Sequence, residues 1–156
     1  MKVVLADAPM ADLKGEAVTE SPNLGMLYII SYARSRLPDA EFHYLEPFLT
    51  LEAHLAEIKR LKPDVYGVSF TTPKKSLAFE VINHVKKVLP SVLIVAGGPH
   101  PTFDASDVFA NSESDICVIG EGEETFVELL KTLREGKELA GVAGISYRNK
   151  LGNISS

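Results

Sequence analysis

The sequence has one cysteine, no excess of basic residues and no long hydrophobic run, and each absence excludes a class of function. Cys117 alone cannot form an internal disulfide or a metal or iron–sulfur site built from several cysteines. Sixteen Lys and Arg residues against 21 Asp and Glu residues give a net charge of −5, whereas nucleic-acid grooves and polybasic membrane surfaces need clustered positive charge. No hydrophobic run approaches the roughly 20 residues of a membrane-spanning helix.

The remaining composition is that of an ordinary globular domain. The chain has 156 residues, of which 46% are hydrophobic and 24% charged. Asp7 interrupts the N-terminus too early for a secretory signal peptide. We therefore expect a single cytoplasmic domain with no nucleic-acid or membrane partner.

Hydrophobic patterns predict alternating strands and helices. Five short runs rich in β-branched residues indicate strands, and three of them are continuously apolar, as in strands that are covered on both faces. The predicted strands are 3–5, 41–45, 65–69, 92–96 and 116–119. Helical stripes lie between and after them, at 24–34, 51–61, 77–88, 104–110 and 126–133. This order predicts an α/β fold with a flavodoxin-like, doubly wound parallel sheet of five strands in the order 2-1-3-4-5, with helices on both faces.

The connections differ between the two edges of the predicted sheet. Turns from helix to strand are short and contain Pro38, Pro63 or Pro90. Loops from strand to helix are longer and rich in Gly, Pro, Ser and Thr, at 7–21, 69–73, 97–102 and 120–122. These longer loops lie at the carboxyl ends of the strands, where open α/β sheets bind ligands. We therefore predict the site at this edge.

The loop after the fourth strand reads Gly97-Gly98-Pro99-His100-Pro101-Thr102. Paired glycines let another molecule approach the backbone closely, and a plain tight turn is the alternative. His100 could be a metal ligand or a general base, but no Asp or second His stands at the spacing of a metal site. We assign no residue a catalytic or metal-binding role.

The loop after the third strand carries three hydroxyl residues, Ser69, Thr71 and Thr72. Ser69 lacks the Gly-x-Ser-x-Gly pattern of a hydrolase nucleophile. Thr72 precedes Pro73, as a helix N-cap often does. Hydrogen bonding to a ligand and helix capping are both open for this segment.

The loop after the fifth strand reads Gly120-Glu121-Gly122-Glu123-Glu124-Thr125. Its carboxylates would repel a phosphate at this helix N-terminus, whereas the glycines could let a bulky neutral group lie against the backbone. Ser69 and Gly120 also stand where a receiver domain needs Asp and Lys, so a phosphoacceptor is not expected. Cys117 lies in a buried strand pattern and is expected to be inert.

Four segments in this order resemble a known family. They are 21–28 (SPNLGMLY), 63–69 (PDVYGVS), 97–102 (GGPHPT) and 120–125 (GEGEET). Together they resemble the N-terminal cobalamin (vitamin B12)-binding domain of B12-dependent radical S-adenosylmethionine (SAM) proteins, a group that includes anaerobic magnesium-protoporphyrin monomethyl ester cyclases and many methyltransferases. The resemblance spans about residues 1–150.

The resemblance implies that cobalamin lies over the carboxyl ends of the strands, with its nucleotide tail drawn into the sheet edge and its corrin facing a partner domain. The cofactor-binding residues that it implies are Ser69, Thr71, Thr72, Gly97, Gly98, Pro99, Gly120, Glu121 and Gly122. One departure is the absence of a cobalt-ligating histidine, which many B12 carriers have in an Asp-x-His-x-x-Gly motif, from residues 7–12. A large, mostly apolar corrin suits small residues and backbone donors.

The resemblance also implies a longer parent protein. Residues 1–140 would form the cobalamin-binding Rossmann-like domain, and 141–156 the start of a hairpin without its second arm, or a linker, toward a C-terminal radical SAM domain. That domain would hold SAM and a 4Fe-4S cluster and perform methyl transfer or radical cyclisation, and the present chain alone would catalyse nothing. The alternatives are a degenerate domain kept for interaction or scaffolding, and a small enzyme that uses Ser69 or His100.

Overall fold

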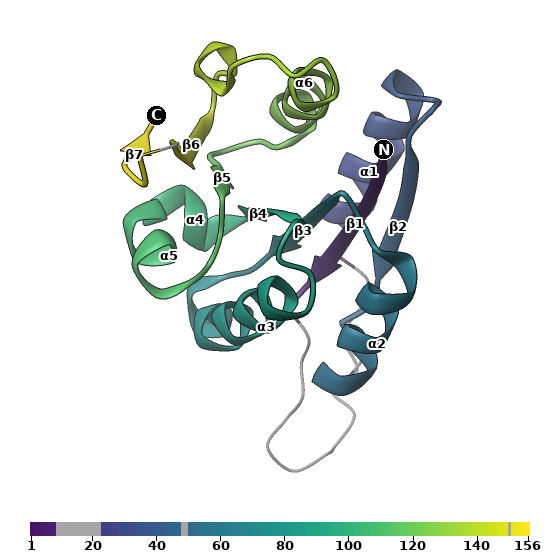
Figure 1. The fold of residues 1–156 in the computed structure, drawn as a ribbon, viewed down its shortest axis with the longest axis vertical. Coiled ribbons are helices and arrows are strands. Elements are labelled where there is room, and N and C mark those ends of the chain that lie inside the picture. Colours follow the sequence, from purple (N-terminus) through teal and green to yellow (C-terminus); the bar gives the residue numbers. More distant parts are fainter. Residues whose placement is uncertain (9–22, 48–49, 150) are drawn as a thin grey trace.

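A seven-stranded sheet forms the centre of the molecule (Figure 1). The computed structural model describes residues 1–8, 23–47, 50–149 and 151–156. The strand order is β2-β1-β3-β4-β5-β6-β7, and the first five strands are parallel. The strands are β1 Lys2–Asp7, β2 Glu41–Leu45, β3 Val65–Ser69, β4 Leu93–Gly97, β5 Ile116–Val118, β6 Ile145–Arg148 and β7 Ile154–Ser155.

Helices cover both faces of this sheet. One hydrophobic cluster joins the strands to α1 and α6, and a second joins them to α2, α3 and α5. Adjacent β1 residues alternate between the clusters, with Val3 and Leu5 in the first and Val4 and Ala6 in the second. The helices are α1 Leu24–Arg36, α2 Leu51–Leu61, α3 Lys75–Val88, α4 Pro99–Phe103, α5 Ala105–Asn111 and α6 Glu123–Arg134, with 3₁₀ turns η1 Thr72–Lys74 and η2 Leu139–Gly141.

The predicted fold class and the parallel strand order 2-1-3-4-5 are confirmed. The number of strands was predicted incorrectly, because β6 and β7 extend the sheet in the antiparallel direction. The hairpin has a short second arm, in which Ser155 pairs with Tyr147 and Ile154 with Arg148. Two residues are too short a run to show strand periodicity.

Arg148 ties the hairpin to the rest of the domain. Its guanidinium donates to the backbone carbonyls of Phe109, Ser112 and Ser114 and lies over the Phe109 ring. Ile145 of β6 is buried in the α1/α6 cluster. The boundary expected after residue 140 therefore falls before a strand that belongs to the sheet, and the division into domains stays a prediction.

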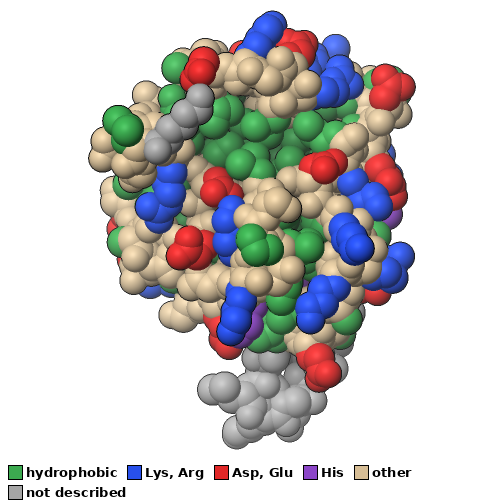
Figure 2. All heavy atoms as spheres, viewed as in Figure 1, with side chains coloured by type: hydrophobic (Ala, Val, Ile, Leu, Met, Phe, Trp, Pro, Cys, Tyr) green, Lys and Arg blue, Asp and Glu red, His purple; other side chains and the backbone are tan. Residues whose placement is uncertain are grey.

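The face shown in Figure 2 has hydrophobic side chains gathered in a hollow between α6 and the strands. Acidic and basic side chains are interspersed over the rest of this face (Figure 2). Among the helices that the structure describes, none has both the length and the apolar composition to cross a bilayer.

Candidate functional site

A cavity of about 390 Å³ lies at the carboxyl ends of β1, β3, β4 and β5. It extends between the sheet and the N-terminal parts of α1 and α6. Eight of the nine residues predicted to bind a cofactor line it: Ser69, Thr71, Gly97, Gly98, Pro99, Gly120, Glu121 and Gly122. The structure thus brings together three loops that are far apart in the sequence.

The glycines around the cavity have two different functions. A Cβ atom built on Gly97 or Gly120 would meet no atom within 4 Å, so both positions leave open space. Gly98 has a φ of +93°, and its Cβ would lie 2.6 Å from the Ser69 Oγ and 3.1 Å from the Phe70 backbone nitrogen. Gly98 therefore allows two loops to approach each other, whereas Gly97 and Gly120 make room.

The inner wall of the cavity is apolar. Leu5, Val95 and Val118 contribute from the strands, and Met26, Ile29 and Phe126 from the helices. Gly67 also lines this part, in the middle of a strand whose Val65, Tyr66 and Val68 pack into the core. Sequence reasoning missed this wall. A Cβ atom on Gly67 would lie 2.3 Å from the Leu5 Cδ2, so the glycine inside this apolar strand makes room for Leu5 of the neighbouring strand.

Asp7 is a charged group in the cavity wall that the predicted set did not include. Its side chain is nearly buried and accepts hydrogen bonds from the Tyr44 hydroxyl at 2.5 Å and the Asn23 Nδ2 at 2.6 Å. Burial, followed by the hydrogen bond to Asp7, raises the pKa of Tyr44 above its usual value, so the hydroxyl keeps its proton. Asn23 also caps α1 by accepting from the Met26 backbone nitrogen. The carboxylate is therefore held in a fixed position.

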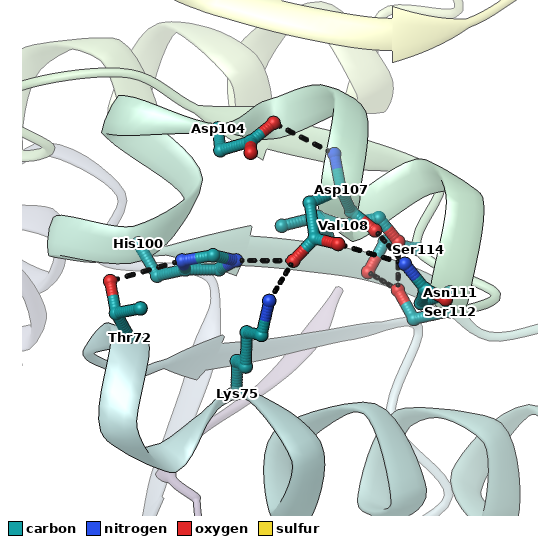
Figure 3. A network of polar contacts seen from close by, with 9 residues as sticks. All are labelled: Thr72, Lys75, His100, Asp104, Asp107, Val108, Asn111, Ser112 and Ser114. Atoms are coloured by element: carbon teal, nitrogen blue, oxygen red, sulfur yellow. Dashed lines mark hydrogen bonds and ion pairs between the residues drawn. The ribbon is translucent and has the colours of Figure 1, made fainter.

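Thr72 is the predicted cofactor-binding residue that does not line the cavity. Its Oγ1 lies 3.2 Å from the Nδ1 of His100, whose Nε2 lies 3.0 Å from the Asp107 Oδ2 (Figure 3). Its predicted role as an N-cap is wrong, because Thr71 occupies the N-cap of η1 and Thr72 is already inside the turn. The contact with His100 engages the hydroxyl instead.

His100 lies inside this polar network (Figure 3) rather than in the cavity wall. It is buried and packs against the rings of Phe70 and Phe79. Lys75 donates to the Asp107 Oδ2 at 2.9 Å, and the hydrogen bonds from Lys75 and His100 lower the pKa of Asp107. The network connects η1 and α3 to α4 and α5. It begins directly after the cavity-lining residues Thr71 and Pro99 in the sequence.

Cys117 is buried in β5, as its strand pattern predicted. Burial raises the pKa of its thiol to about 12, as expected for an inert core thiol. Most of the first loop, from which a cobalt-ligating histidine is missing, lies outside the described residues. Glu123 also lines the cavity and begins α6.

A family model described as the B12 binding domain matches residues 10–130. The chain belongs to the B12-binding domain family. The resemblance found in the four sequence segments is thereby confirmed, and the cavity lies at the edge where that resemblance places the cofactor.

Relatives of this B12-binding domain are longer proteins. An uncharacterized methyltransferase of Pyrococcus horikoshii is 34% identical over 150 residues, which are 95% of this chain and 33% of the methyltransferase. The anaerobic magnesium-protoporphyrin IX monomethyl ester cyclase of Cereibacter sphaeroides is 34% identical over 95 residues, which are 58% of this chain and 16% of the cyclase. The chain thus spans a third or less of the length of these two relatives.

The fold also matches one part of a solved enzyme structure. The cobalamin-dependent S-adenosylmethionine radical enzyme OxsB, with aqua-cobalamin and S-adenosylmethionine bound, has a TM-score of 0.84 to this chain at 24% identity. The match covers 99% of this chain and 21% of OxsB.

Proposed function

We propose that this domain holds cobalamin at its cavity as the cofactor module of a radical SAM enzyme. The observation that carries the proposal is the cavity itself. It lies at the carboxyl ends of the strands, next to open space at Gly97 and Gly120, in a chain of the B12-binding family. The cytoplasmic location expected from the sequence is part of this proposal.

The shape and chemistry of the cavity fit one part of cobalamin. Its volume of about 390 Å³ suits a small ligand or part of a large one, and a corrin with its side chains is larger. The apolar inner wall, which includes Leu5, Val118 and Phe126, suits the flat aromatic base of the nucleotide tail. The corrin would then lie at the mouth.

The residues at the rim would position the cofactor by hydrogen bonds and by leaving space. Ser69 and Thr71 supply hydroxyl groups, and Gly97 and Gly120 leave the space that a passing tail requires. The Gly120 amide donates to the Thr102 Oγ1 at 3.0 Å, which fixes the loop. Bound cobalamin would supply a cobalt centre that carries a methyl group or an electron.

Helix α1 presents an apolar surface beside the cavity. Leu24 is 79% exposed and Tyr28 is 65% exposed, whereas Gly25 and Met26, which stand between them in the sequence, line the cavity. Exposed apolar groups next to a ligand site are typical of a surface that another domain covers. We assign this surface to a radical SAM domain of the same polypeptide, which would hold SAM and the 4Fe-4S cluster and perform the methyl transfer or cyclisation.

The direct test is to add aquacobalamin to the purified chain. We expect retained colour after gel filtration, a change in the cobalamin absorption spectrum, and a melting temperature that rises with cofactor concentration. A domain that kept its fold only as an interaction module would show none of the three. That result would overturn the proposal.

A further inference from the structure

The cavity is lined by charges of both signs, but unevenly. Among the described residues of its wall, three are acidic, namely Asp7, Glu121 and Glu123, and Lys74 is the single basic residue. An anionic group inside the cavity would be repelled by the carboxylates and attracted by the ammonium group of Lys74. Among the described side chains of the wall, Lys74 is thus the one whose charge would favour a negative group.

The backbone of Lys74 is fixed on both sides. Two residues earlier, Thr72 contacts His100, and one residue later, Lys75 forms an ion pair with Asp107 at 2.9 Å (Figure 3). The Lys74 amide itself donates to the Thr71 carbonyl at 3.0 Å. Lys75 thus contacts α5, whereas its neighbour Lys74 lines the cavity.

Cobalamin carries a single permanent anionic group. The side chains around its corrin are neutral amides, and the negative charge belongs to the phosphodiester of the nucleotide tail. That phosphodiester lies between the corrin and the base along the covalent structure. With the base in the apolar interior and the corrin at the mouth, it would lie near the rim, where the loop of Ser69, Thr71 and Lys74 contributes to the wall.

We propose that the ammonium group of Lys74 binds the phosphodiester of the nucleotide tail and thereby selects complete cobalamins over corrinoids without the tail. This inference rests on the proposed function, since it assigns a specificity-determining residue within the same site. The contact is a charge-assisted hydrogen bond, which is stronger than a neutral one.

The test compares Lys74→Gln with Lys87→Gln, a control that removes the same charge from an exposed position in the last turn of α3. Both variants are titrated with aquacobalamin and with diaquacobinamide, which lacks the phosphodiester, ribose and base. We expect Lys74→Gln to weaken aquacobalamin binding about tenfold and to leave cobinamide binding unchanged. We expect Lys87→Gln to bind both ligands as the unsubstituted chain does, and Lys74→Arg to restore most of the affinity.

Ionic strength gives a second readout on aquacobalamin alone. The affinity of the unsubstituted chain should fall as salt screens the contact, and Lys74→Gln should lose most of this dependence. Equal aquacobalamin affinities for the two glutamine variants, equal losses with both corrinoids, or an unchanged salt dependence would each overturn the inference. Failure of the unsubstituted chain to bind aquacobalamin would instead overturn the proposed function.

Discussion

The hydroxyl of Tyr44 donates a hydrogen bond of 2.5 Å to the carboxylate of Asp7. This contact joins β2, at the edge of the sheet, to the wall of the cavity at the end of β1. The two residues are 37 positions apart, and Asn23 holds the second carboxylate oxygen. In the described part of the chain, the side chains that position this charged group are thus uncharged.

Tyr44→Phe should lower the free energy of unfolding by about 1–3 kcal/mol, because a nearly buried carboxylate loses one of the two side-chain donors that the described residues supply. Urea denaturation at pH 7 measures the change. Tyr28→Phe is the matched control, since the Tyr28 side chain is 65% exposed, and it should differ from the unsubstituted chain by less than about 0.5 kcal/mol. Equal stabilities for the two variants would show that the Asp7 contact contributes nothing.

Gly97→Leu should block cobalamin binding and leave the fold intact. The Cβ position of Gly97 faces open space, so a larger side chain can enter the cavity without meeting the backbone. Gly141→Leu is the control, because Gly141 also has open space at its Cβ position and is absent from the residues that line the cavity. We expect aquacobalamin affinity to fall more than about tenfold for Gly97→Leu alone. Unaltered affinity would place the ligand elsewhere.

His54 should make the domain less stable in acid. Its ring is fully buried beside Tyr66, its Nε2 lies 2.9 Å from the Tyr66 hydroxyl, and its Nδ1 has no partner among the described residues. Burial lowers its pKa from 6.5 to about 4. The unfolded chain therefore binds a proton more readily, and stability is present above pH 6.5 and is lost as the pH falls toward 4.

The loss attributable to His54 should be about 2 kcal/mol between pH 7 and pH 5. Urea denaturation at both pH values measures it, and His54→Gln should lose correspondingly less stability over this interval. His84→Gln is the control, since His84 lies on the outer side of α3 and bonds only the Glu80 carbonyl among the described contacts. Identical pH dependence in the unsubstituted chain and His54→Gln would contradict the prediction.

Removal of β6 should prevent stable folding. A chain that ends at residue 140 loses the pairing of β6 with β5, the buried side chains of Val142 and Ile145, and the Arg148 contacts. Each buried aliphatic side chain contributes about 1.5–3 kcal/mol, against a typical total stability of about 5–15 kcal/mol. Circular dichroism should show a weaker or absent cooperative transition for 1–140 and a retained one for 1–149. Equally cooperative melting of both would support a boundary at 140.

The sequence predicted the fold well because buried parallel strands carry a strong local signal. The runs that became β3 and β4 are almost wholly apolar, and the longer loops after them identified the carboxyl edge. The inner wall could not be predicted in the same way, since Leu5, Gly67 and Phe126 are brought together only by tertiary packing. Thr72 shows the opposite case. Its local pattern predicted a helix cap, whereas in the structure its hydroxyl contacts His100, 28 residues away.

The cavity wall combines residues from the beginning and the end of the chain. Met26 and Ile29 come from α1, whereas Glu123 and Phe126 come from α6, and α1 and α6 lie against each other. During synthesis on the ribosome, this wall is incomplete until α6 has emerged. Under the proposed function, loading of the cofactor would follow translation of nearly the whole domain, and a nascent chain that stalls before residue 123 would have no enclosed site to fill.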